Sequence, residues 1–240
     1  MSQHERPEQA LEWVADGTRR LLADLAALSD AALDSPTLLP GWNRRHLLSH
    51  VANNASALRN LVHWAKTGEE RRMYASGEQR AADIAAGASA PAGELRSLVE
   101  ASAAALGADL DGMPPPAWSA QVITAQGLTR YAVEIPWMRV REAYVHTVDL
   151  DAGTEFADLP GTFLTTLLAD IVGRRTTMAD GPALALTATD TGASWSVAGH
   201  GDPVSIDAPL ATLTQWLAGR PAPGLTDAAG ARVPELPAWL

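Results

Sequence analysis

Two residues that can bind a metal ion, Glu142 and His146, stand four positions apart in the segment REAYVH. On an α-helix, four residues correspond to about 400° of rotation and about 6 Å of rise, so both side chains would lie on one face. Such a pair supplies two ligands for a divalent metal, and a third must come from another helix. The same spacing also suits an ordinary pair on a helix surface, and both interpretations stay open at this point.

His50 is the best candidate for a third ligand, because it lies beside the apolar stripe of a predicted helix, in the sequence LLSHVA. Two histidines and one carboxylate compose a zinc site that leaves a position open for water or substrate, although the same ligands suit iron. Without a metal, His50 would be a hydrogen-bonded core histidine. His46 could pair with His50, but it follows Asn-Arg-Arg, and we expect it to be solvated.

Other ionisable residues are expected to have smaller roles. Asp149 could orient His146, but we interpret it as a charge at a helix end. His4, His63 and His200 are interpreted as bystanders, and His200 is placed in a glycine-flanked turn. The pattern is not H-E-x-x-H, so it does not support peptide hydrolysis.

Further side chains could contact a ligand. Arginines could hold a carboxylate with their planar fork, and the candidates are Arg80, Arg139 and Arg141. Aromatic and amide groups could line a cleft, although large aromatics in a bundle more often belong to its core; these are Trp42, Gln126, Trp137 and Tyr144.

These residues fall in a chain whose first part has helical periodicity. Apolar residues that recur about every 3.6 positions, together with start and stop signals, predict helices in this part. The predicted helices span residues 8–28, 43–66, 92–110 and 136–150. Residues 69–90 are expected to form a long crossing loop with some helix, and residues 118–133 to be irregular or weakly extended. Four helices with one long connection predict a four-helix bundle.

The pattern of apolar residues changes after Asp151, where short β-type runs appear among the predicted helices. A helix is predicted at 160–178, short β-type runs at 183–190, 193–199 and 203–208, another helix at 209–218, and a Pro- and Gly-rich tail at 219–240. The predicted fold class is therefore α+β, with a helical bundle at residues 1–152 and a small α+β domain at residues 153–240.

Composition excludes several classes of function. The chain has 240 residues, a formal net charge of −10 and no cysteine. Negative charge argues against binding to nucleic acid or anionic membranes, so an anionic substrate would need a local positive site. Without cysteine there is no disulfide and no cysteine nucleophile, and any thiol must come from outside. The start is charged and no apolar run reaches the roughly 18 residues of a membrane span. We therefore expect a cytoplasmic protein, and a monomer.

Several segments occur in an order and spacing specific to one family. They are LPGWNRRHLLSHVANNASALRNLVHWAKTGEERRMY at 39–74, TAQG at 124–127, PWMRVREAYVHTVDL at 136–150, LAGRPAPG at 217–224 and PELPAWL at 234–240. Together they resemble the mycothiol-dependent maleylpyruvate isomerases, which belong to the DinB-like metal-binding bundle superfamily. The resemblance covers nearly the whole chain, whereas the single motif GWxxxHLxxHVA is more widespread in that superfamily.

The resemblance implies a zinc site formed by His50, Glu142 and His146 in a DinB-like four-helix bundle, with mycothiol as the thiol cofactor. It also implies an essential arginine in the C-terminal domain, which corresponds to Arg220. The residue after Arg220 is proline, which is a local departure from the family pattern.

The implied reaction is the cis–trans isomerisation of maleylpyruvate to fumarylpyruvate in gentisate catabolism. A zinc-activated thiolate would add to the conjugated double bond, the resulting single bond would rotate, and the thiol would leave. Three alternatives remain: another zinc- and mycothiol-dependent S-transferase of the superfamily, a non-catalytic metal-binding module, and a zinc hydrolase for which no general base stands out.

Overall fold

The computed structural model describes residues 4–237, which form two compact units that divide between Thr154 and Glu155. The division lies two residues beyond the boundary expected from the sequence. The end of the PELPAWL segment, residues 238–240, lies outside the described residues. Within the described part of the chain, no helix is both long and apolar enough to cross a membrane.

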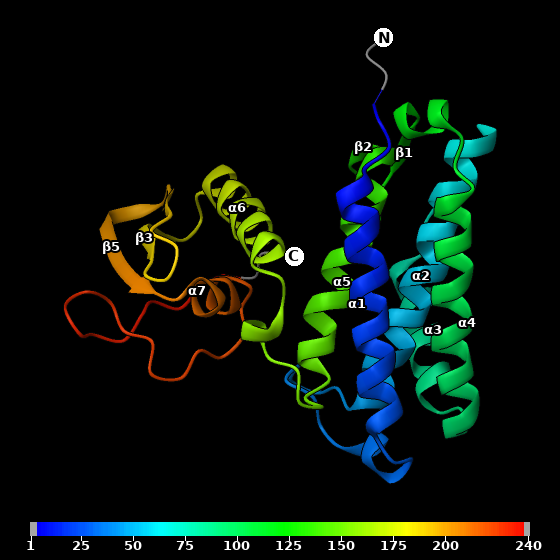
Figure 1. Cartoon of the computed structure of the whole chain (residues 1–240), viewed down its shortest axis with the longest axis horizontal. Coiled ribbons are helices and arrows are strands. Elements are labelled where there is room, and N and C mark those ends of the chain that lie inside the picture. Colours follow the sequence, from blue (N-terminus) through cyan, green and yellow to red (C-terminus); the bar gives the residue numbers. More distant parts are fainter. Residues whose placement is uncertain (1–3, 238–240) are drawn as a thin grey trace. The chain divides into compact units, whose positions relative to one another are not determined.

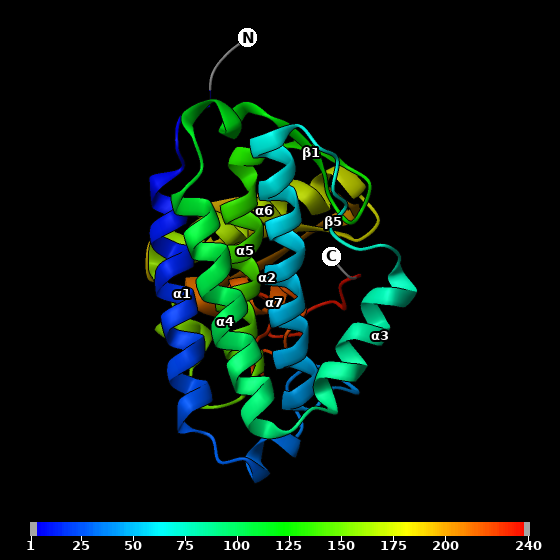
Figure 2. The ribbon, with the colours of Figure 1, turned by 90° about the vertical axis from the view of Figure 1, so that its right-hand side faces the viewer.

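The first unit is built on four long helices, which Figures 1 and 2 show running side by side. They are α1 (Glu8–Ala27), α2 (Arg44–Thr67), α4 (Ala92–Asp111) and α5 (Ile135–Asp149). Helix α1 packs against α4 and α5, and α2 packs against the same two helices. The four-helix bundle predicted from periodicity is therefore confirmed, with helix ends within about two residues of those expected.

Local sequence signals explain where the helices begin, end and approach. The side chain of Asn43 accepts a hydrogen bond from the His46 backbone N–H at 3.1 Å, which caps the start of α2. Gly68 ends the helix with a left-handed φ of 78°. Helix α5 can approach α1 closely at Gly17, where a Cβ atom would lie only 3.1 Å from that of Ala143.

The connections in this unit are more regular than the sequence indicated. The expected crossing loop contains α3 (Gly77–Ala88), which lies outside the four long helices and packs against α2 (Figure 2). The region 118–133 contains an antiparallel hairpin of β1 (Gln121–Ile123) and β2 (Thr129–Tyr131). Short 3₁₀ helices complete the connections: η1 (Ala31–Asp34), η2 (Pro115–Ser119) and η3 (Ala132–Glu134).

The second unit combines two helices with a three-stranded sheet. After η4 (Phe156–Asp158) come α6 (Gly161–Met178), β3 (Pro182–Ala188), β4 (Ser194–Val197), β5 (His200–Ala208) and α7 (Leu210–Leu217). The strand order is β4–β3–β5, with β3 antiparallel to β4 and parallel to β5. His200 is the first residue of β5 and pairs with Pro182, so its placement in a turn was wrong. The α+β fold class is confirmed.

Candidate metal centre

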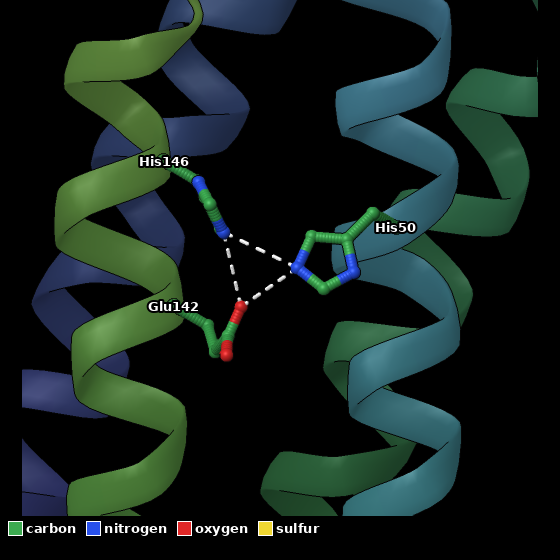
Figure 3. Close-up of side chains that lie close together, drawn as sticks. All are labelled: His50, Glu142 and His146. Atoms are coloured by element: carbon green, nitrogen blue, oxygen red, sulfur yellow. Dashed lines mark hydrogen bonds and ion pairs between the residues drawn. The ribbon is translucent and has the colours of Figure 1, made fainter. Parts of the chain in front are cut away.

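Three side chains from two helices meet in the bundle. His50 comes from the second turn of α2, and Glu142 and His146 come from adjacent turns of one face of α5 (Figure 3). The Nε2 atom of His50 lies 2.9 Å from Oε2 of Glu142 and 3.2 Å from Nε2 of His146. The third side of the triangle, from His146 Nε2 to Glu142 Oε2, is 3.1 Å. The three residues singled out by spacing are thus brought together.

This triangle has the dimensions of a metal site. Tetrahedral zinc with ligand distances near 2.0–2.1 Å separates its donor atoms by about 3.3 Å. The three donors are close to that separation, and His50 is buried while the other two are partly exposed. The residues therefore fit a divalent ion that keeps one coordination position toward solvent or a ligand.

Asp149 holds one of the imidazoles in place. Its Oδ2 atom accepts a hydrogen bond from Nδ1 of His146 at 2.8 Å, and its side chain is completely buried. The interpretation of Asp149 as a plain charge at a helix end was therefore wrong. Because Nδ1 is directed to Asp149, the other ring nitrogen of His146, Nε2, faces Glu142 and His50.

Burial and hydrogen bonding set the charges of the three donors. Burial lowers the pKa of His50 and keeps its ring neutral at pH 7. Burial would raise the pKa of Glu142, but hydrogen bonds from His146 and His50 outweigh it and hold that pKa well below its usual value. Burial would likewise lower the pKa of His146, yet its hydrogen bonds to Asp149 and Glu142 raise it to about 9. The metal-free site thus contains an ionised carboxylate and one protonated imidazole.

Two further groups contact His50. The ring of Trp42 meets it edge-on, with centroids 5.4 Å apart, so Trp42 lies beside the donor triangle. Arg80, from the first turn of α3, places Nη2 at 3.2 Å from Nδ1 of His50. The guanidinium of Arg80 also lies over the ring of Tyr74, 5.6 Å from its centroid. Tyr74 was not among the sequence candidates, and only the folding of the segment before α3 brings it here.

Arg139 and Tyr144 have structural contacts instead. Arg139 is buried and donates from Nη1 to the backbone oxygen of Val51 at 2.9 Å and to Oδ1 of Asn54 at 3.1 Å, which ties α5 to α2. Its burial lowers its pKa to about 10. Tyr144 donates to Oδ2 of Asp16 on α1 at 2.8 Å. The predicted ligand contact of Tyr144 is therefore not supported, because its side chain faces α1.

Gln126, His46 and His63 are not among the donors of the triangle. Gln126 is exposed in the turn of the hairpin that precedes α5, whereas Glu142 lies at the middle of that helix and His146 in its second half. His63 pairs with Glu69 at 3.1 Å, and His46 bonds to Asn43 near the start of α2. The pairing of His63 is consistent with its interpretation as a bystander. His46, which was expected to be solvated, is half-buried and stacks on Trp42, with ring centroids 6.5 Å apart.

Arg220 belongs to the second unit, just after α7. Its Nη1 atom donates to the backbone oxygen of Ala218 at 2.6 Å. It lines a pocket of about 730 Å³ together with Trp216, Pro221, Arg232 and neighbouring residues of the tail. A guanidinium that lines such a pocket is suited to bind a carboxylate.

Comparisons with known proteins agree with this fold. The family model described as the mycothiol maleylpyruvate isomerase N-terminal domain matches residues 6–151. The crystal structure of a mycothiol-dependent maleylpyruvate isomerase is 40% identical to the chain, with a TM-score of 0.92 and 97% of both chains covered. A mutant of such an enzyme matches at 39% identity with the same TM-score and coverage.

A more distant structure shares the fold alone. YfiT from Bacillus subtilis, described as a probable metal-dependent hydrolase with an unusual four-helix bundle topology, is 13% identical, with a TM-score of 0.51 over 60% of this chain and 83% of that chain. None of the curated protein sequences matches the chain.

The fold and the donor triangle define a four-helix bundle with a candidate metal centre, in a chain that continues into a small α+β unit. Within that class, the chain belongs to the mycothiol-dependent maleylpyruvate isomerase family.

Proposed function

We propose that this chain is a zinc- and mycothiol-dependent enzyme that isomerises maleylpyruvate to fumarylpyruvate, a step of gentisate catabolism. The observation that carries the proposal is the triangle of His50, Glu142 and His146, with donor separations of 2.9–3.2 Å, in a chain of this family. A bound zinc ion would supply an open position that binds a thiol as thiolate. Mycothiol would supply the sulfur nucleophile that a chain without cysteine lacks.

The charges of the donors suit this role. Glu142 is ionised and offsets one of the two charges of the metal, while His50 and His146 would bind as neutral imidazoles. With one anionic and two neutral ligands, the metal site then retains about one positive charge. That charge would favour binding of the thiol as a thiolate. The hydrogen bond that His146 donates from Nδ1 to Asp149 keeps Nε2 of His146 directed toward the other donors.

We further propose that Arg220 binds a carboxylate of the dianionic substrate or stabilises the enolate oxygen of the reaction. The planar guanidinium can donate two parallel hydrogen bonds to a carboxylate. The net charge of −10 by itself would repel an anionic substrate, and a local arginine would offset that repulsion at the binding site. The pocket that contains Arg220 supports this proposal.

The test measures conversion of maleylpyruvate by the purified chain, with and without mycothiol and with and without zinc. Turnover is expected only when both are present. His50→Ala should remain folded and lose zinc and turnover together. His63→Ala is the matched control, since His63 is also on α2 and also pairs with a carboxylate. A folded, zinc-loaded chain without turnover would contradict the isomerase proposal and favour the S-transferase alternative.

A further inference from the structure

The two histidines of the triangle differ in what their second ring nitrogen meets. Nδ1 of His146 faces the carboxylate of Asp149 at 2.8 Å, which is a hydrogen-bond acceptor. Nδ1 of His50 faces Nη2 of Arg80 at 3.2 Å, and a guanidinium can only donate. The contact with Arg80 therefore requires a lone pair on Nδ1 of His50 and places the proton of the neutral ring on Nε2.

Metal binding requires the opposite arrangement. A histidine that binds a metal through Nε2 needs its lone pair there, and its proton then lies on Nδ1. Two N–H groups would then face each other between His50 and Arg80. The contact seen in the structure and metal ligation by Nε2 of His50 thus exclude one another, whereas the contact between His146 and Asp149 favours metal ligation.

Arg80 hydrogen-bonds the side chains of His50 and Tyr74, and a guanidinium has five N–H groups, so some of its donors remain for an external anion. Arg80 is half-buried beside the ring of Tyr74, and within residues 4–237 it forms no ion pair with a carboxylate. Arg139, by comparison, already donates to Val51 and Asn54. Arg80 is thus a guanidinium next to the donor triangle, and its contact with His50 is lost when the metal site fills, whereas its contacts with Tyr74 can persist.

We propose that Arg80 leaves His50 when a metal binds and then holds a carboxylate of the dianionic substrate beside the metal. This inference rests on the proposed function, because it assumes a metal in the triangle and a dicarboxylate substrate. It assigns to the first unit a carboxylate-binding residue in addition to the one proposed at Arg220. The ring of Tyr74 would keep the guanidinium close to the site after the exchange.

The test compares Arg80→Met with Arg72→Met in two binding assays. Arg72 is a matched control, because its guanidinium also lies over an aromatic ring, 5.9 Å from the centroid of Trp64, and it pairs with Glu70. Zinc affinity is measured by competition with a chromophoric chelator. Binding of maleate, an unreactive cis-dicarboxylate in the absence of thiol, is measured by calorimetry on the zinc-loaded proteins.

Arg80→Met should bind zinc about five-fold more tightly, since no donor competes for Nδ1 of His50. It should bind maleate about ten-fold more weakly, since one charge-assisted contact is lost. Arg72→Met should change neither affinity. A merely structural role of Arg80 would weaken both affinities together, so the opposite directions separate the two explanations.

Unchanged or weaker zinc binding by Arg80→Met would overturn the inference, and so would unchanged maleate binding. If those results came from a chain that still isomerises maleylpyruvate with zinc and mycothiol, only this inference would fail. A wild-type chain that does not bind zinc would overturn the proposed function as well.

Discussion

Oδ2 of Asp149 accepts a hydrogen bond from Nδ1 of His146, three residues earlier on α5, across 2.8 Å. The carboxylate is completely buried, whereas the histidine that it orients is partly exposed to solvent. A buried acceptor fixes both the ring orientation and the position of its proton, so the metal affinity of the site should depend on a residue that does not touch the metal.

We expect Asp149→Asn to lower zinc affinity about 10- to 100-fold, because an amide holds the ring less strongly and carries no charge. Chelator competition measures the change. Asp16→Asn is the control, since Asp16 also accepts a hydrogen bond from a residue of α5, Tyr144, on the side facing α1. Equal zinc affinities of the wild type and Asp149→Asn would show that the hydrogen bond does not support the site.

Metal affinity should rise with pH. The pKa of His146 is raised to about 9 in the metal-free protein, so below pH 9 a metal must displace its proton. The pKa shifts of Glu142 and His50 are downward, and these two ligands are already deprotonated near neutral pH. Zinc affinity should therefore increase about ten-fold per pH unit from about pH 7 and level off above pH 9. Calorimetry in buffers of different ionisation enthalpy should detect about one proton released per zinc at pH 7; release of none would contradict the protonated state of His146.

Substituting Arg220 should separate turnover from metal binding. We expect Arg220→Ala to retain wild-type zinc affinity and to lower kcat/KM for maleylpyruvate by about two orders of magnitude, because a charge-assisted contact to the substrate is lost. Arg232→Ala is the matched control, since Arg232 lines the same pocket of the second unit. Similar kinetics of both variants would remove Arg220 from the proposed site.

Arg44 should be important for stability without touching the donors. Its buried guanidinium donates to the backbone oxygens of Leu150 at 2.7 Å and Ala32 at 3.0 Å, and also to that of Asp151. Arg44→Met would leave these acceptors without their donor, and it should lower the free energy of unfolding by about 2–4 kcal/mol. Urea denaturation measures the loss. Arg59→Met, which removes an exposed ion pair with Asp109, should cost less than about 1 kcal/mol; equal losses would show that the carbonyl contacts of Arg44 add nothing.

The sequence by itself predicted the parts of this protein that depend on helical periodicity. Glu142 and His146 share a face because they are four residues apart on one helix, and that relation holds wherever α5 lies. The apolar stripe beside His50 turns that residue inward for the same reason. Helix ends followed from local signals such as Asn43 at the start of α2 and Gly68 at its end.

Contacts between elements were decided only by the tertiary structure. Arg80 and Tyr74 reach the site because a segment expected to be mainly a crossing loop contains α3 packed against α2, and nothing in the spacing of those residues specifies that packing. Tyr144 stands between Glu142 and His146 in sequence but faces α1, since successive positions of a helix point in different directions. The position of Asp149 at the end of α5 allows it either to orient His146 or to be a solvated charge. Its complete burial and its hydrogen bond determine that it orients His146. Periodicity fixes which residues share a face, whereas burial and side-chain packing from distant segments fix what that face meets.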